Sequence, residues 1–158
     1  MIMLRRLTPD DLPRLRQIWK ENWGDEFMVA HGVVYHPESL VGLIAFDKYE
    51  WVGEITYQFL EDCCEIVTLD SVRERHGLGT KLIDTVVEEA RKQHCKRVFL
   101  ITTNDNLNAL GFYQKRGFQL VKINRGAVNE ARMIKPSIPL IGMNNIPLRD
   151  EIELEIIL

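Results

Sequence analysis

The stretch from Val72 to Leu82, V-R-E-R-H-G-L-G-T-K-L, constrains the fold more than any other part of this chain. It follows an apolar run typical of a strand and opens a run with helical periodicity. Gly77 and Gly79 permit a sharp turn and a close backbone approach, and basic side chains surround them. Because the first N–H groups of a helix point outward and carry partial positive charge, such a turn is suited to binding phosphate. The pattern predicts a phosphate-bearing ligand at the start of a helix.

The spacing of the glycines narrows the class of ligand. A P-loop requires G-x-x-x-x-G-K-[ST], which this stretch lacks, and a dinucleotide fingerprint requires a third glycine where Leu82 stands. At this point a tight strand-to-helix turn that binds no ligand remains an equally good interpretation.

A second motif runs from Asn106 to Phe118, N-L-N-A-L-G-F-Y-Q-K-R-G-F. It follows the pattern N-x-x-A-x-x-F-Y-x-x-x-G-F through Asn106, Ala109, Phe112, Tyr113, Gly117 and Phe118. Together with the preceding G-x-G, it resembles the GNAT superfamily of acyl-CoA-dependent N-acyltransferases. The resemblance covers roughly residues 1–125, with both motifs in the family's order. Three segments, at 102–110, 135–139 and 146–154, look like one bacterial branch of the superfamily.

Glu74 departs from the family pattern, which usually has Arg or Gln at this position. A carboxylate repels a pyrophosphate, so the side-chain part of the motif differs here from the family. The backbone N–H groups are unaffected by the change, and Arg73 and Arg75 offer positive charge beside it.

The resemblance implies acetyl-CoA as the acyl donor, with its pyrophosphate on the N–H groups of residues 75–80. It places the pantetheine between strands at 63–72 and 97–103, whose ends splay apart. The implied cofactor-binding residues are Leu69, Ser71, Val72, Arg75, His76, Gly77, Leu78, Gly79, Thr80, Asn106 and Tyr113. Asn104 and Asn108 are weaker candidates. A backbone N–H near Leu69 would face the thioester oxygen.

Tyr113 matches the family tyrosine that acts as general acid on the departing sulfur. A phenol with an ordinary pKa near 10 can donate a proton at neutral pH. The alternative is a core aromatic, because Ala109, Phe112 and Tyr113 have i, i+3, i+4 spacing.

The general base has several candidates. An alkylamine with a pKa near 10 arrives charged, so a group on the protein must take its proton. Glutamates of the central strands often do this in the superfamily, and Glu54 and Glu65 lie on the corresponding hairpin. Asp70 and Glu153 are further options. For each carboxylate taken alone, a solvated or ion-paired side chain is the favoured interpretation.

The expected fold is an α/β (α+β) domain covering residues 1–158, with a cofactor core at 63–118 and a C-terminal loop and strand at 127–158. Its mixed central sheet has an antiparallel N-terminal meander, a βαβ cofactor unit and flanking helices. We expect strands at 2–7, 40–46, 51–60, 63–72, 97–103, 118–123 and 151–158. We expect helices from a cap at Thr8, at 77–94, at 106–116 and at 127–135. Residues 22–37 are interpreted as a broken helix and loop, and 136–148 as a long loop. The resemblance implies that 22–37 lines the acceptor side, and an ordinary packed connection is at least as good an interpretation.

Composition excludes several classes of protein. A net charge of −3 gives no general attraction to nucleic acid or anionic membrane. No apolar run approaches the roughly 20 residues of a membrane span, and no signal peptide is recognisable, so cytoplasm is expected. Cys63, Cys64 and Cys95 have no framework spacing, which favours reduced thiols. The histidines show no metal-ligand spacing, so no metal is expected.

The favoured function is acetyl transfer from acetyl-CoA to a primary amine by direct attack on the thioester. A non-catalytic acetyl-CoA or CoA sensor on the same fold is the first alternative, and a nucleotide-binding or kinase-like protein is the second. The acceptor is a small-molecule or protein amine: a protein N-terminus, a lysine, an amino acid, a polyamine or an amine drug. A homodimer is possible.

Overall fold

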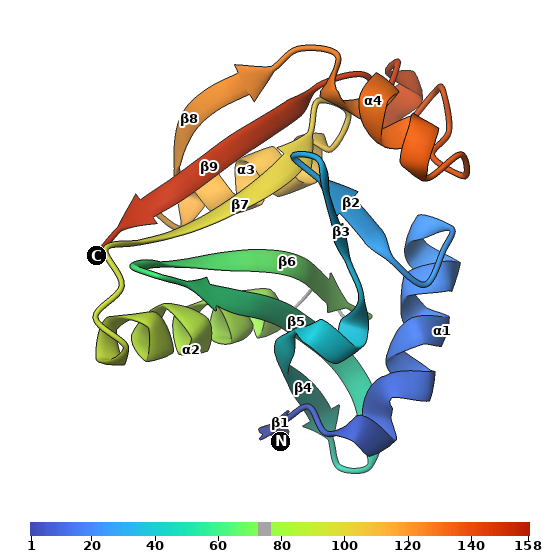
Figure 1. The fold of residues 1–158 in the computed structure, drawn as a ribbon. Coiled ribbons are helices and arrows are strands. Elements are labelled where there is room, and N and C mark those ends of the chain that lie inside the picture. Colours follow the sequence, from blue (N-terminus) through green and yellow to red (C-terminus); the bar gives the residue numbers. More distant parts are fainter. Residues whose placement is uncertain (73–76) are drawn as a thin grey trace.

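The computed structural model describes residues 1–72 and 77–158 and is built around a seven-stranded mixed sheet (Figure 1). The strand order is β1-β4-β5-β6-β7-β9-β8. The strands are β1 (Ile2–Arg6), β4 (Val41–Asp47), β5 (Glu50–Leu60), β6 (Cys63–Ser71), β7 (Arg97–Thr103), β8 (Gln119–Asn124) and β9 (Glu151–Ile157). The first four in this order form an antiparallel meander, β6 pairs with β7 in parallel, and β9 is antiparallel to both β7 and β8. The expected mixed sheet and its meander are confirmed.

Helices cover both faces of the sheet. They are α1 (Leu12–Trp23), α2 (Leu78–Lys92), α3 (Leu107–Lys115) and α4 (Ala127–Ile134), with short 3-10 turns at Pro9–Asp11, Pro37–Ser39 and Met143–Asn145. Helices α2 and α3 contribute to the main core on one face. Helix α1 packs on the opposite face in a second apolar cluster that includes Leu15 and Trp19. No helix within residues 1–72 and 77–158 is long and apolar enough to cross a membrane.

The unit formed by β6, α2 and β7 is explained by its sequence pattern. Leu78, Leu82, Val86 and Ala90 are all buried, as their helical spacing predicts. Strand β7 is largely buried and covers the predicted residues 97–103. Since β6 and β7 are parallel neighbours, the carboxyl end of β6 and the start of α2 lie at the same edge of the sheet as the end of β7.

The strands β6 and β7 separate toward their carboxyl ends, as Figure 1 shows. Their pairing ends at Ile66 and Leu100. Beyond that point β6 remains paired with β5 as far as Ser71, and β7 remains paired with β9 as far as Thr103. The register of β5 with β6 also shifts at this level, which adds a bend to β6. We call the opening between the two strand ends the splay.

The prediction of a broken helix and loop for residues 22–37 is wrong. Helix α1 ends at Trp23, and a hairpin follows, made of β2 (Met28–Ala30) and β3 (Val33–Tyr35). Its turn, His31–Gly32, has positive φ at both residues (40° and 78°), the backbone twist that two-residue hairpins need. Each strand has three residues, too few for a recognisable alternation in the sequence.

The C-terminal segment is ordered by polar contacts to the end of β7. Asp105 is buried and accepts hydrogen bonds from the backbone N–H of Met143 and from Thr103. Strand β9 lies between β7 and β8, with Leu154 in the core and the glutamates of this strand on the opposite face, as its alternation predicts.

Candidate active site

A polar row lies on the α1 face of the sheet, beside the splay. Glu54 on β5 is directly opposite Asp70 on β6, and Thr56 is opposite Thr68. The alternation of β5 explains this row, because Ile55 and Tyr57 point to the other face and join the main core. Two predicted carboxylates, Glu54 and Asp70, are thereby brought together where β6 has left β7.

Glu54 is a buried carboxyl group with one oxygen available to accept a proton. Its side chain is 1% exposed, its Oε2 accepts a hydrogen bond from Thr68 at 3.1 Å, and its Oε1 has no partner among the described residues. Burial, reinforced by the charge of Asp70, raises the pKa of Glu54 to about 8. A carboxyl group with that pKa titrates close to neutral pH, which suits a general base.

Glu65 is equally buried, but both of its oxygens are engaged. Oε1 accepts hydrogen bonds from the Tyr35 hydroxyl at 2.6 Å and from Gln58 at 3.1 Å. Oε2 lies 2.8 Å from Nε2 of His31, and the hydrogen bond to Glu65 raises the pKa of His31. The structure therefore places this predicted catalytic residue in a network that ties β6 to the β2–β3 hairpin.

The remaining carboxylate candidates differ in their partners. Asp70 is half-buried, which raises its pKa, while hydrogen bonding from Asn22 opposes that shift. Glu153 is ion-paired with Arg97 at 2.9 Å and is therefore committed to a structural contact. Glu151 was not predicted; it is buried, and its Oε1 accepts a hydrogen bond from the backbone N–H of His31 at 3.0 Å.

Tyr113 lies on α3 among aromatic side chains, as both interpretations of its sequence motif allow. Its ring makes edge contacts with Phe112 and Phe118 at centroid distances of 5.1 and 5.5 Å. Burial, followed by the negative charge of Glu54, raises the pKa of Tyr113 above its ordinary value. The hydroxyl makes no hydrogen bond to another described residue, and Glu54 lies within electrostatic reach of it. Tyr113 thus remains protonated and able to donate at neutral pH.

The start of α2 has the geometry that the glycine pair predicts. Gly77 is its N-cap in the left-handed conformation (φ 70°), and the helix begins at Leu78, whose side chain is buried. Gly79 is closely packed, because a Cβ there would lie 3.0 Å from Cζ of Phe112. Arg75 and His76, predicted to bind the pyrophosphate, lie outside the described residues.

Arg116 joins the starts of the two motifs, a role that sequence reasoning missed. Its Nε donates to Oγ1 of Thr80 at 2.7 Å, and its Nη1 donates to the carbonyl of Phe112 at 2.8 Å. The guanidinium also lies 3.7 Å from the centroid of the Phe112 ring. The arginine in the second motif, four residues after Phe112, was the available signal.

The residues predicted to pair with pantetheine lie at the carboxyl end of β6, on one side of the splay. Leu69 packs against the main core, and Ser71 is paired with Gly53 of β5. The N–H of Val72 donates to the carbonyl of Val52 at 2.9 Å, which commits that donor to β5.

The three asparagines near α3 have separate roles. Asn106 is the N-cap of α3, where its Oδ1 accepts from the N–H of Ala109 at 3.1 Å, and its side-chain nitrogen makes no hydrogen bond to another described residue. Asn104 holds the C-terminal segment through Pro147 and Arg149. Asn108 is exposed.

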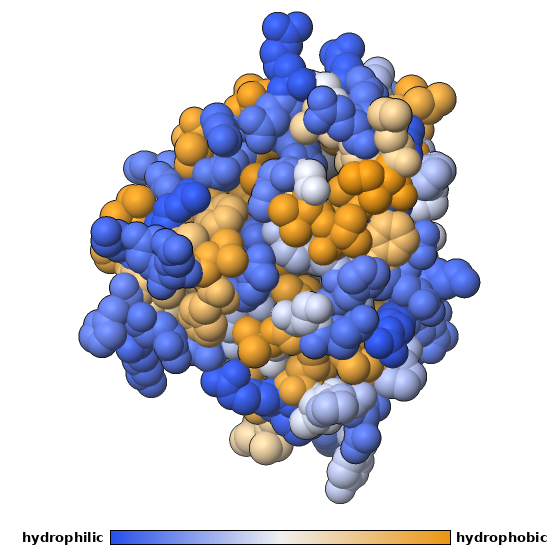
Figure 2. All heavy atoms as spheres, in the orientation of Figure 1, coloured by the Kyte–Doolittle hydropathy of each residue, from blue (hydrophilic) through white to orange (hydrophobic). Residues whose placement is uncertain are grey.

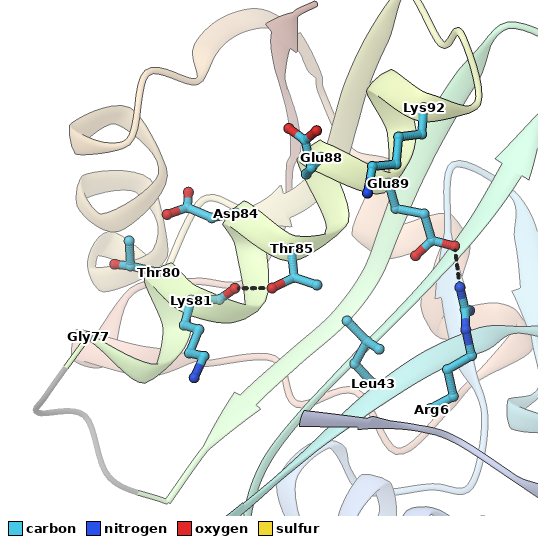
Figure 3. Close-up of a pocket in the computed structure, with 10 residues that line it drawn as sticks. All are labelled: Arg6, Leu43, Gly77, Thr80, Lys81, Asp84, Thr85, Glu88, Glu89 and Lys92. Carbon is cyan, nitrogen blue, oxygen red and sulfur yellow. Dashed lines mark hydrogen bonds and ion pairs between the residues drawn. The ribbon is translucent and has the colours of Figure 1, made fainter. Parts of the chain in front are cut away.

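An open trough of about 940 Å³ follows the outer face of α2, away from the splay (Figure 3). It begins at Gly77 and Thr80, and its far end is crossed by the ion pair between Arg6 and Glu89 at 2.8 Å. Charges of both signs line it, among them Lys81, so its walls favour neither an anion nor a cation. The described residues contain no cluster of histidine, cysteine or carboxylate side chains that could hold a metal ion.

The surface around the hairpin is apolar. Figure 2 shows apolar side chains gathered over the region where Figure 1 places the hairpin, and Val33 and Val34 are both exposed there. His31 and Tyr35 of the hairpin were not predicted as site residues. Their signal was a histidine and a tyrosine within an otherwise apolar stretch beside glycine.

A parallel strand pair that splays, a glycine-led helix start and a buried carboxylate within electrostatic reach of a tyrosine are the features expected from the two sequence motifs. A family model described as "Acetyltransferase (GNAT) family" matches residues 4–118, and the chain belongs to this family. Membership implies acetyl transfer from acetyl-CoA, and the resemblance stated from the two motifs is confirmed.

Known proteins agree with this assignment. The uncharacterized protein YxbD of Bacillus subtilis (strain 168) is 45% identical over 146 residues, covering 92% of this chain and 91% of that protein. A GNAT family acetyltransferase from Elizabethkingia anophelis with acetyl-CoA bound has a TM-score of 0.74 at 22% identity, covering 99% of this chain and 98% of the other. NAA60 of Arabidopsis thaliana in complex with a bisubstrate analogue has a TM-score of 0.71 at 20% identity, with 99% and 98% covered. The two structural likenesses establish the fold.

Proposed function

We propose that this protein transfers the acetyl group of acetyl-CoA to a primary amine, with Glu54 as general base and Tyr113 as general acid. The observation that carries the proposal is the unpartnered Oε1 of the buried Glu54 carboxylate, within electrostatic reach of Tyr113. A general base and a general acid on either side of a reaction centre are what acyl transfer to an amine requires.

The residues around the splay fit acetyl-CoA. The N–H groups at the start of α2, led by Gly77, suit its pyrophosphate. From Val67 to Asp70, β6 has no strand partner on the β7 side among the described residues, so this edge can pair with the pantetheine amides. The side-chain nitrogen of Asn106 makes no hydrogen bond within the part of the chain that the structure describes, and it can donate to the same arm. When bound, acetyl-CoA supplies an activated thioester, and the Elizabethkingia relative holds that molecule.

The proton transfers assigned to the two residues balance. Glu54 in its ionised form takes a proton from the ammonium group, which leaves a neutral amine with a free electron pair. The amine nitrogen forms the new bond to the acetyl carbon as the bond from that carbon to sulfur breaks. Tyr113 gives its proton to the departing sulfur, which leaves as a thiol. The attacking nitrogen loses its second proton as the bond to sulfur breaks, and that proton passes through water to the Tyr113 phenolate, which restores Tyr113. Glu54 releases its proton to bulk water, so the reaction yields one amide, one thiol and one proton.

The charges on the acceptor face favour a cationic acceptor. Glu54 and Asp70 have no Arg or Lys partner among the described residues, and an incoming ammonium group compensates buried negative charge. The NAA60 structure, which holds a bisubstrate analogue, is a precedent for an acceptor site on this fold.

The test is thiol release from acetyl-CoA with a panel of amines, comparing wild type with Tyr113→Phe. We expect release with one class of amine and a loss of turnover on the order of 100-fold in the variant, while acetyl-CoA affinity stays within about twofold. The background from the three cysteines is subtracted with a sample that lacks amine. Turnover unchanged in the variant would remove Tyr113 as the acid. Binding of acetyl-CoA without release for any amine would favour the sensor.

A further inference from the structure

We propose that His31 is a positioning residue that fixes the tip of the β2–β3 hairpin over the narrow end of the splay and so forms one wall of the acceptor site. The proposal rests on the proposed function for the identity of that site. It assigns the Glu65 carboxylate to holding this wall, in place of removing a proton from the substrate.

The contacts of His31 connect three separate parts of the sheet. Its Nε2 lies 2.8 Å from Oε2 of Glu65 on β6 and 2.9 Å from the hydroxyl of Tyr35. Its backbone N–H donates to Oε1 of Glu151 on β9 at 3.0 Å. Its ring lies 6.4 Å, between centroids, from that of Phe99 on the intervening strand β7. The hairpin tip is therefore bound on both sides of β7, by two carboxylates that are each almost fully buried.

The place of this contact is the narrow end of the splay. Glu65 directly precedes Ile66, the last residue of β6 that pairs with β7. In Figure 1 the hairpin crosses the opening between the carboxyl ends of the two strands. The hairpin therefore lies on the same face of the sheet as Glu54, at the narrow end of the opening.

The backbone of His31 is held in an unfavourable conformation. Its φ of 40° lies in the left-handed region, where a histidine is less stable than asparagine or glycine. The two-residue turn requires this backbone conformation, and the imidazole bond to Glu65 and the backbone bond to Glu151 hold His31 in it.

The hairpin has few other attachments. It forms a separate two-stranded sheet that is not paired with the main sheet. Met28 and Tyr35, which form the base of the hairpin, and Ala30, which precedes the turn, pack in the cluster beneath α1. Release of His31 would thus remove the polar attachment of the tip while leaving the apolar packing of the hairpin in place.

The protonation of His31 is set by the groups that face it. These are Glu65 from β6, Glu151 and Glu153 from β9, and the Tyr35 hydroxyl from the hairpin itself. The hydrogen bond and charge of Glu65 raise the pKa of His31, so the ion pair is complete below the ordinary histidine pKa of about 6.5 and is lost as the pH rises through the raised value. The ion pair therefore holds the hairpin tip most strongly at pH values below the raised pKa of His31.

The experiment compares wild type with His31→Asn. Asparagine suits the left-handed turn and keeps the backbone bond to Glu151, but its side chain is too short to reach Glu65. We expect KM for the amine acceptor to rise on the order of tenfold through lost positioning, with the Kd for acetyl-CoA within about twofold of wild type. His36→Asn, at the other end of the hairpin, is the matched control and should leave both constants unchanged.

A second readout does not depend on turnover. Amide hydrogen exchange at Ala30 and Val33, the pair that flanks the turn, should be faster in His31→Asn than in wild type, and unchanged in His36→Asn. The His31 imidazole, followed by NMR, should titrate at a lower pH in Glu65→Gln. Tyr35→Phe removes one hydroxyl from the same network and replaces His31→Asn if that variant fails to fold.

The outcomes separate the two proposals. Unchanged exchange in the hairpin of the variant would overturn the anchoring role, and faster exchange with an unchanged acceptor KM would overturn the acceptor wall. If wild type acetylates no amine, the proposed function fails, while the exchange and titration data still decide whether His31 anchors the hairpin.

Discussion

Glu54 and Glu65 lie on neighbouring strands and face the same side of the sheet, but they differ in how many hydrogen-bond partners their carboxylate oxygens have. Glu65 has hydrogen bonds at both oxygens. Glu54 has one bond, from Thr68, and a second oxygen without a partner. A buried polar atom left unsatisfied costs stability, so its retention is explained if it acts on a ligand. The comparison favours Glu54 as the base.

At the residue scale, Glu54→Gln should remove the pH dependence that this carboxyl imposes. With a pKa of about 8, the ionised fraction of Glu54 rises about tenfold per pH unit below 8 and levels off above it. We expect wild-type kcat/KM to follow this rise, and the variant to lose it together with turnover on the order of 100-fold. Rates measured from pH 6 to 9.5 with one amine provide the check. Glu65→Gln is the control and should keep the rise near pH 8.

Ionisation of Glu54, which should raise activity as the pH rises, should lower the stability of the folded protein. The pKa of Glu54 is about 8 in the folded protein, well above the ordinary glutamate value of about 4.3 in the unfolded chain. Between these values the unfolded state releases a proton that the folded state keeps, so this group lowers stability as pH rises. Glu54→Gln should therefore raise Tm more at pH 9 than at pH 5. An equal change at both pH values would contradict the buried, unpaired state of this carboxyl.

At the element scale, the contact between α2 and α3 fixes the helix start that is proposed to bind pyrophosphate. Gly79 allows the ring of Phe112 to approach α2, and the guanidinium of Arg116 lies over that ring. Arg116 also binds Thr80 in the first turn of α2. The two sequence motifs are therefore parts of one packed unit, which explains their joint occurrence better than two independent roles would.

Gly79→Ala and Gly111→Ala form a matched pair that tests this contact. A Cβ at Gly79 would lie 3.0 Å from Phe112, so we expect overpacking to outweigh the gain in helix propensity and to cost about 1 kcal/mol. A Cβ at Gly111 meets nothing within 4 Å in the described protein, so alanine should stabilise α3 by about 0.5–1 kcal/mol. Urea unfolding of both variants gives the comparison. Equal stabilisation by the two changes would show that the Phe112 ring moves aside freely.

The position of Gly111 inside α3 has two possible explanations. A glycine inside a helix is explained by a close backbone approach or is a mild defect, and the described residues make no such approach. If acetyl-CoA itself approaches this position, Gly111→Ala will weaken its binding while stabilising the free protein. If the affinity is unchanged, the glycine is a mild defect of α3.

At the scale of the whole molecule, the sheet is divided by the splay into two halves joined at one parallel pair. The meander with β6 forms one half, and β7, β9 and β8 form the other. Their direct pairing ends at Ile66 and Leu100. A ligand that fills the splay would connect the two halves and stabilise both of them together.

We expect acetyl-CoA to raise Tm for this reason. A ligand at about 100 times its Kd adds about 2.7 kcal/mol, which corresponds to roughly 5–10 °C for a domain of this size. Amide exchange should slow along β6 beyond Ile66 as its free edge gains a partner. ATP is the control, because it has phosphates but no pantetheine. An equal rise in Tm with ATP would favour the nucleotide-binding alternative over the acetyltransferase.

The sequence by itself determined the strand–helix–strand unit, the glycine-led helix start and the alternation of β9, since each depends on local periodicity and on backbone conformations that few residues allow. Two motifs sufficed to identify the family. The tertiary structure alone decided which carboxylate keeps a free oxygen, because burial and hydrogen-bond partners come from strands distant in the chain. It alone revealed the hairpin as well, since strands of three residues carry no periodic signal. His31 meets Glu65 and Glu151 only after β6, β7 and β9 have assembled, a contact that no spacing in the chain encodes.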